Sequence, residues 1–291
     1  MRIDRPMASP EPVTWIRKDF HVHERHSKDA PGATVEKYCR IAESRGIDEV
    51  ALTTHFIITG PDWDFGLQPH QISGYLEEIE AAQEGTDVAL RRGVEVDYFP
   101  GEERRIGSIL DEHQWDFILG SLHFVKGIDI GSRRNSPLFF KGRRPGEALD
   151  VYFREFQKAV ESGLFDVIAH PDYFRKYTPL TYESPVIWEQ YGTKVYDALD
   201  SLRSHGVGFS VNASGWRHGI GDVYPIEGFA RAAFEAGVEA VTIGSDCHTV
   251  FDLGANTLKC LERLEKVGYT HLSTYENRII RRVALKDLRV S

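Results

Sequence analysis

The chain has 291 residues and carries 35 Lys and Arg against 44 Asp and Glu, which gives a formal net charge of −9. This acidic balance argues against a general nucleic-acid binder, and 41% hydrophobic residues exclude a disordered polymer. Three scattered cysteines (Cys39, Cys247 and Cys260) exclude a disulfide framework, and no apolar run approaches the roughly 18 residues of a membrane span. We expect a cytoplasmic globular protein without nucleic-acid or membrane partners; a monomer and a homo-oligomer both stay open.

Residues 1–12 contain three prolines and little apolar surface, which predicts a flexible tail. Residues 13–291 contain no linker or repeat, so a single domain is expected there. Seven short apolar runs in this domain have the length of buried strands. They are Trp15–Phe20, Glu49–Thr54, Val88–Val94, Asp116–Gly120, Asp166–Ala169, Val207–Val211 and Ala240–Gly244.

Amphipathic stretches between these runs have the apolar spacing of helices. The first begins after Thr34, a residue type that caps helices at this position. The helices are predicted to end at Gly46, Gly163, Gly206, Gly237 and Gly268. Alternating strands and helices predict a parallel sheet, either open or closed into a barrel.

Each predicted strand ends in, or is followed by, a polar side chain, and most of these side chains can bind a metal. They are His21, His23, His55, Glu95, His123, His170, Asn212, Asp246 and His248. In a closed barrel the carboxyl ends of the strands surround one site, whereas an open sheet would spread these residues along an edge. The pattern therefore favours the barrel.

The candidate metal ligands are six histidines (21, 23, 55, 123, 170 and 248) and the carboxylates of Asp29, Glu95 and Asp246. In an extended His-x-His segment both rings lie on the same side and can hold one ion. Nine ligands exceed the roughly four of a single catalytic ion, so we expect two or three divalent ions such as Zn, Mn or Fe. Buried structural histidines and a non-catalytic metal store are the alternatives.

The remaining histidines fall in stretches predicted as helix or loop. We expect His70, His113, His205, His218 and His271 at the surface, and we leave His26 open.

The ordered motifs resemble the PHP (polymerase and histidinol phosphatase) superfamily from about Phe20 to Gly254. Within it, the stand-alone histidinol-phosphate phosphatases share three further patterns found here. These are Gly-x-Glu-x-Asp at Gly93–Asp97, Gly-Ser-x-His at Gly120–His123, and Asn-x-x-Gly-x-Arg at Asn212–Arg217 followed by Tyr224-Pro225. The resemblance implies a distorted (β/α)7 TIM-like barrel, the PHP fold.

The resemblance also implies three metal sites. The first takes His21, His23, Glu95 and Asp246; the second takes His123 and His170 with Glu95 as a bridge; the third takes Asp29, His55 and His248. The chain departs from the family at two positions near the third site. Asp29 stands where the family often has His, and Thr54 stands where it often has Asp.

This family implies a metal-dependent phosphomonoesterase, a histidinol-phosphate phosphatase of histidine biosynthesis, in which a metal-bridging hydroxide attacks phosphorus. Glu95, Asp246 and His248 are assigned as catalytic. The substrate is then a small phosphorylated molecule. Its expected contacts are Arg217, Arg175, Asn212 and Lys176, with Asp172 as the candidate general acid.

Residues 130–146 carry five basic side chains and no acid (Arg133, Arg134, Lys141, Arg143 and Arg144). Because the segment follows the fourth strand, it predicts a basic flap that attracts an anionic substrate, with a solvated loop as the alternative. Two other functions stay open. One is a PHP phosphoesterase acting on another small phosphate or a nucleotide, and the other is a non-catalytic metal-binding docking module.

Overall fold

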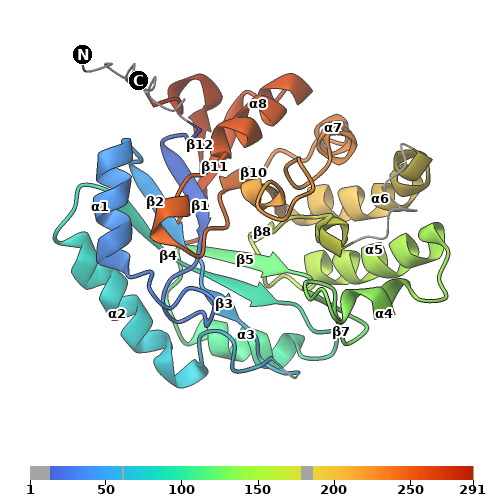
Figure 1. Ribbon diagram of the computed structural model, residues 1–291, viewed down its shortest axis with the longest axis horizontal. Coiled ribbons are helices and arrows are strands. Elements are labelled where there is room, and N and C mark those ends of the chain that lie inside the picture. Colours follow the sequence, from blue (N-terminus) through green and yellow to red (C-terminus); the bar gives the residue numbers. More distant parts are fainter. Residues whose placement is uncertain (1–13, 61, 178–185, 291) are drawn as a thin grey trace, which may run out of the picture.

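A nearly closed barrel of parallel strands forms the centre of the molecule (Figure 1). The computed structural model describes residues 14–60, 62–177 and 186–290, with only the backbone described for 186–193. The strand order is β1 (Lys18–Val22), β2 (Glu49–Leu52), β4 (Ala89–Asp97), β5 (Phe117–Ser121), β8 (Val167–Ile168), β9 (Gly208–Asn212) and β10 (Val241–Gly244). A short β3 (His55–Phe56) continues beside β4. The seven predicted strands and the TIM-like barrel are confirmed; the predicted tail, residues 1–12, lies outside the described residues.

Helices surround the strands on the outside of the barrel (Figure 1). The predicted ones are α1 (Val35–Arg45), α5 (Pro145–Glu161), α6 (Val186–His205), α7 (Glu227–Glu235) and α8 (Thr257–Val267). The structure adds α2 (Ile72–Gln83), α3 (Glu103–Asp111) and the short α4 (Ser136–Phe140). Gly46 ends α1 in the left-handed region at φ 67°, as expected, but the Thr34 side chain makes no capping hydrogen bond. No described helix combines the length and apolar character that crossing a membrane requires.

The barrel closes where β1 meets the segment after β10. The Asp246 amide donates to the His21 carbonyl at 2.8 Å, and the His23 amide donates to the Cys247 carbonyl at 3.0 Å. Gly244 permits this approach, because a Cβ there would lie 2.2 Å from the His21 Cβ. The buried Asp19 carboxylate accepts the Ser245 amide at 2.8 Å and so ties β1 to the same segment. These contacts hold two groups of predicted ligands in fixed register.

A hairpin that the sequence did not predict covers the amino ends of the strands. It consists of β11 (His271–Glu276) and β12 (Ile279–Ala284), paired antiparallel. Tyr275 enters the barrel interior and packs against Phe117, with ring centroids 5.0 Å apart. At the tip of the hairpin, the Asn277 amide donates to the carboxylate of Asp116, the residue directly before β5, at 2.9 Å. The opposite, carboxyl end therefore remains as the face for a functional site.

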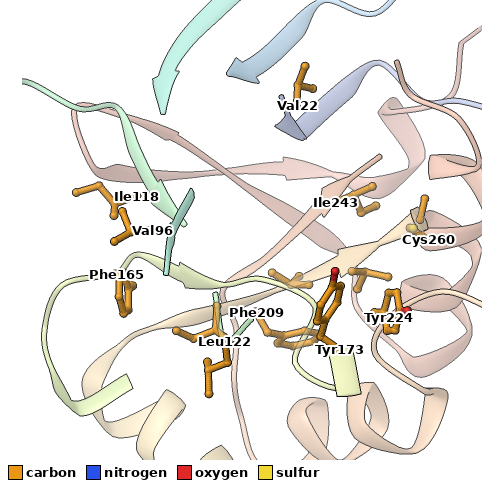
Figure 2. Packing of buried hydrophobic residues seen from close by; sticks show 14 of the residues in the cluster. Val22, Val96, Ile118, Leu122, Phe165, Tyr173, Phe209, Tyr224, Ile243 and Cys260 are labelled. Atoms are coloured by element: carbon orange, nitrogen blue, oxygen red, sulfur yellow. The ribbon is translucent and has the colours of Figure 1, made fainter. Parts of the chain in front are cut away.

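The core between strands and helices is tightly packed. Figure 2 shows Val96 and Ile118 near Phe165, and Tyr173 close to Tyr224. All five are buried.

We expect Gly120→Ala, a substitution inside this core, to destabilise the fold. The new Cβ would lie 2.5–2.9 Å from Phe165 ring atoms, so the ring has to move, at a cost of about 1–3 kcal/mol in the free energy of unfolding. The control is Gly74→Ala in α2, where a Cβ meets nothing within 4 Å and should add about 0.5–1 kcal/mol. Urea unfolding followed by circular dichroism measures both; equal effects would contradict the packing described.

Candidate metal centre

The structure brings all nine predicted ligand residues together at the carboxyl end of the barrel. They come from β1 and the segment after it, from β3 and β4, and from the segments directly after β5, β8 and β10. Parallel strands in a barrel present their carboxyl ends to one another, so residues far apart in sequence converge there. Eight of the nine form overlapping groups whose nitrogen and oxygen atoms lie within 4.8 Å of one another, and Asp29 adjoins them at 3.1 Å from His248.

Glu95 lies at the middle of this arrangement and its side chain is fully buried. Its Oε1 lies 3.2 Å from His170 Nε2 and 3.8 Å from His123 Nε2. The same oxygen lies 3.4 Å from His21 Nε2, and Oε2 lies 3.5 Å from His23 Nε2. One carboxylate thus faces both the predicted first and the predicted second site.

The first predicted site is compact and buried. The Nε2 atoms of His21 and His23 lie 3.0 Å apart. Asp246 Oδ1 lies 3.5 Å and 3.2 Å from them, respectively. Two backbone conformations beside this site are strained: Asp246 has φ 56° and His170 has φ 28°. Non-glycine residues adopt such angles at a free-energy cost that the surrounding structure has to offset, as is common at functional sites.

The third predicted site is more open. Asp29 Oδ2 lies 3.1 Å from His248 Nε2 and 4.0 Å from His55 Nε2, and the Asp29 side chain is 39% exposed. His248 Nδ1 donates to the Asp246 carbonyl at 3.1 Å, which leaves the lone pair on Nε2, the atom that faces Asp29. Thr54 stands where the family often has Asp, and its Oγ1 forms a hydrogen bond with Ser27 Oγ at 2.6 Å.

Two residues outside the predicted ligand set orient the ligands. The buried Asp97 carboxylate accepts His123 Nδ1–H at 3.2 Å, which directs Nε2 toward Glu95. Asn212, predicted as a substrate contact, donates to the Asp246 carboxylate at 3.3 Å. The Gly-x-Glu-x-Asp spacing places Asp97 two residues after Glu95 on the same face of β4, and this alternation was the available signal for Asp97.

Burial and neighbouring charges together set the pKa values of the ligand side chains. Burial alone would raise the pKa of Glu95, but His21, His123 and His55 hold it well below its ordinary value. Burial lowers the pKa of His23 well below its ordinary value, and His55 and His248 add to that effect. Glu95 is therefore an anion and the His23 ring beside it is neutral, which are the protonation states in which these two groups bind metals.

The predicted phosphate contacts differ in their surroundings. Arg217 Nη2 donates to the Ser245 carbonyl at 2.7 Å, so this guanidinium is anchored on the loop that carries Asp246. Lys176 Nζ donates to the Tyr173 hydroxyl at 2.8 Å beside the cavity at the centre. Arg175 instead bonds Asp172 Oδ2 at 3.1 Å and Asp222 Oδ2 at 3.3 Å.

Asp172 also accepts the Ile226 amide at 2.8 Å through the oxygen that Arg175 contacts. These contacts give Asp172 a structural role; its assignment as general acid has no support from them.

Among the histidines expected at the surface, His70, His205 and His271 are exposed, although His271 begins β11 instead of lying in a loop or helix. His113 and His218 are half-buried. His218 Nδ1 lies 3.1 Å from the Tyr224 hydroxyl because the loop after β9 folds back over the barrel, which corrects its placement at the surface. His26 pairs with Glu24 at 2.9 Å, in a group that also includes Glu78.

We expect Asp97→Asn to lower the pKa of His123. In the metal-free chain burial opposes the charge on His123, but Asp97 and Glu95 outweigh it and raise its pKa from 6.5 to about 9. A raised pKa contributes stability that is complete below pH 6.5 and is lost as the pH rises through about 9. The stability difference between the native sequence and the variant should therefore shrink from pH 6.5 to 9.

NMR titration of the histidine rings and urea unfolding at several pH values, both without metal, measure these effects. The exposed Asp111→Asn is the control. An unchanged His123 pKa in the Asp97 variant would contradict the assigned contact.

Comparison with known proteins places the chain in a family. A family model described as PHP domain matches residues 19–214. A Deinococcus radiodurans protein named "Probable histidinol-phosphatase" is 29% identical over 258 residues, covering 86% of this chain and 93% of that protein. The Lactococcus lactis subsp. lactis "Histidinol-phosphatase" is 22% identical over 264 residues, covering 88% and 93%.

A crystal structure of histidinol phosphate phosphatase from Lactococcus lactis, described as complexed with zinc, L-histidinol and phosphate, has the same fold. It aligns with a TM-score of 0.79 at 20% identity, covering 91% of this chain and 98% of that one. Because the family match extends from β1 into the loop after β9 and agrees with the observed barrel, the chain belongs to the PHP domain family.

Proposed function

We propose that the chain is a metal-dependent phosphomonoesterase that hydrolyses L-histidinol phosphate to L-histidinol and phosphate, a step of histidine biosynthesis. The observation that carries the proposal is the convergence of nine nitrogen and oxygen donor residues, with the buried carboxylate of Glu95 at their middle, beside a cavity. The relatives named histidinol-phosphatase and the fold of the Lactococcus enzyme support the choice of substrate.

The donor set fits divalent transition metals. His23 Nδ1 and His170 Nδ1 are buried without a hydrogen-bond partner among the described residues. Glu95 Oε2 also makes no hydrogen bond there, although His55 Nδ1 lies 2.9 Å from it. Buried polar atoms are normally paired, so unpaired ones in a converging set suggest ligands. Imidazole with carboxylate suits Zn, Mn or Fe. We propose two or three ions, held by His21, His23, Glu95 and Asp246; by His123, His170 and Glu95; and by Asp29, His55 and His248.

Ions bound there would lower the pKa of a water nucleophile and neutralise charge on the phosphoryl oxygens. Among the chain's own groups, Glu95 joins two ligand sets, and Asp246 and His248 position the first and third sets against each other. Arg217 is proposed to bind the phosphate, because its anchor on the Ser245 carbonyl fixes the guanidinium beside the centre. For Arg175, whose guanidinium is held by two carboxylates, we propose a positioning role.

We further propose that the protein works in a reducing compartment such as the cytoplasm. Cys39, Cys247 and Cys260 are all buried as free thiols. The absence of nucleic-acid partners and the oligomeric state stay predictions.

Glu95→Gln and His170→Ala should each abolish phosphate release from histidinol phosphate, with a loss of at least about 100-fold, because each removes a proposed ligand to a shared ion. The assay uses the full chain supplied with Zn²⁺ or Mn²⁺, and circular dichroism checks the fold. The exposed His205→Ala serves as the control. Full activity in either variant would refute the ligand assignment, and no phosphatase activity of the native chain on a substrate panel would favour the docking module.

Arg217→Ala should raise KM for histidinol phosphate about tenfold with a smaller change in kcat, because a phosphate contact is lost. Arg175→Ala should instead lower the thermal stability, since it removes an ion pair to the buried Asp172. Steady-state kinetics and thermal unfolding of both variants separate the two roles. A raised KM with unchanged stability in the Arg175 variant would restore Arg175 as a phosphate contact.

A further inference from the structure

A cavity of about 220 Å³ adjoins the metal centre, and its wall combines two kinds of polar side chain. His55 and His123, which belong to the centre, line it together with the carboxylates of Asp62 and Asp129. A phosphate held by the centre would leave the rest of its ester in the cavity beside these carboxylates.

Asp62 and Asp129 differ from the other carboxylates of this cavity because they lack a cationic partner. Asp29 pairs with His248, and Asp97 pairs with His123. In the part of the chain that the structure describes, no Lys, Arg or His nitrogen lies within the 4 Å of an ion pair from Asp62 or Asp129, and both carboxylates are half-buried. Lys176 lines the same cavity, but its Nζ donates to the Tyr173 hydroxyl at 2.8 Å. Partly buried anions of this kind favour a cation from outside the chain.

The Asp129 carboxylate is held in a fixed position. Its Oδ1 accepts the amides of Gly131 at 2.8 Å and Ser132 at 3.0 Å. Gly131 itself lies against Tyr173, where an added Cβ would come within 3.1 Å of the ring. A charge fixed by backbone amides before a ligand arrives requires little reorganisation on binding.

None of the five basic side chains of the predicted flap lines this cavity. Arg133 stacks on Tyr177, Arg143 lies over the Phe139 ring, and Arg144 pairs with Glu147. The residue of this loop region that reaches the cavity with a charge is Asp129, directly before the basic segment. The charge that the loop offers to a substrate is therefore negative.

Aromatic side chains form another part of the cavity wall. Phe65, Phe124 and Tyr173 line the cavity together with Ile57. Phe65 lies beside His55, with ring centroids 5.9 Å apart, and Tyr173 lies beside His123 at 4.8 Å. These walls suit a flat ring or a hydrocarbon stem attached to the phosphate.

We propose that Asp62 and Asp129 bind the ammonium group of a phosphorylated amino alcohol and make the enzyme prefer cationic phosphate monoesters over neutral ones. The inference rests on the proposed phosphatase function and assigns the residues that select its substrate. Carboxylates that bind an ammonium group discriminate strongly against an analogue without it, because binding that analogue leaves them buried and unpaired.

The test compares Asp62→Asn and Asp129→Asn with the native full chain loaded with Zn²⁺. The substrates are histidinol phosphate, its analogue without the amino group, and p-nitrophenyl phosphate. We expect KM for histidinol phosphate to rise at least about tenfold in each variant, while kcat/KM for the two other substrates stays the same or rises, because the variants leave no unpaired charge beside them. In the Asp129→Asn variant the side-chain amide oxygen can still accept the Gly131 and Ser132 amides, so the loop should keep its shape.

Asp64→Asn is the matched control, because Asp64 is exposed in the same loop as Asp62 and pairs with Lys28. Calorimetric binding of L-histidinol gives a readout independent of turnover, and Asp129→Asn should weaken it to a similar extent. Equal losses for all three substrates, or unchanged histidinol binding, would overturn the proposal.

A different result would count against the proposed function alone. If the native chain hydrolyses phosphoethanolamine but not histidinol phosphate, the assigned substrate is wrong. The ammonium subsite would then still be supported if Asp129→Asn removes the preference for phosphoethanolamine over p-nitrophenyl phosphate, and refuted if the preference stays.

Discussion

The burial of the Glu95 carboxylate at the end of β4 is the constraint on which the site depends. A carboxylate without access to water is costly unless positive charge or hydrogen-bond donors surround it. Here the imidazoles of His21, His55, His123 and His170 approach it within 2.9–3.8 Å. These rings come from four different strand ends, so the anion stays buried only when the barrel is assembled. These imidazoles reduce the free-energy cost of burying the Glu95 carboxylate. They are also the groups that would bind ions together with Glu95.

The contacts between β1 and the end of β10 fix the positions of the ligands. Gly244 lets the two backbones approach, and the Asp19 carboxylate accepts a hydrogen bond from the Ser245 amide, which ties β1 to the segment after β10. His21 and Asp246 then meet through a backbone hydrogen bond as well as through their side chains. The strained φ of Asp246 follows from this double requirement, because its amide closes the barrel while its carboxylate turns inward. Stability of the barrel and precision of the site thus depend on the same few contacts.

The parts of the site that could be predicted are those that depend on periodicity. A polar residue at the end of an apolar run marks the carboxyl end of a strand, and parallel strands place all such ends on one face. Asp97 follows the same alternation and could have been included. The role of Arg175 could not be predicted, because its partner Asp222 lies 47 residues away and is reached only through the folded loop after β9. The hairpin β11–β12 could not be predicted either, because β12 is mostly exposed and shows no buried pattern in the sequence. Of the hairpin, Tyr275 belongs to the cluster inside the barrel.

The cavity shows why the acidic composition of the chain is compatible with a phosphate substrate. A net charge of −9 argues against an anionic ligand if charge is counted over the whole chain, yet local fields decide binding. At the centre, ions and Arg217 would supply positive charge for a phosphate, while Asp62 and Asp129 add negative charge to the wall of the adjoining cavity. A ligand with a phosphate at one end and an ammonium at the other fits this field in one direction only. Orientation, and with it the position of the phosphorus atom at the centre, would then follow from charge before any close contact forms.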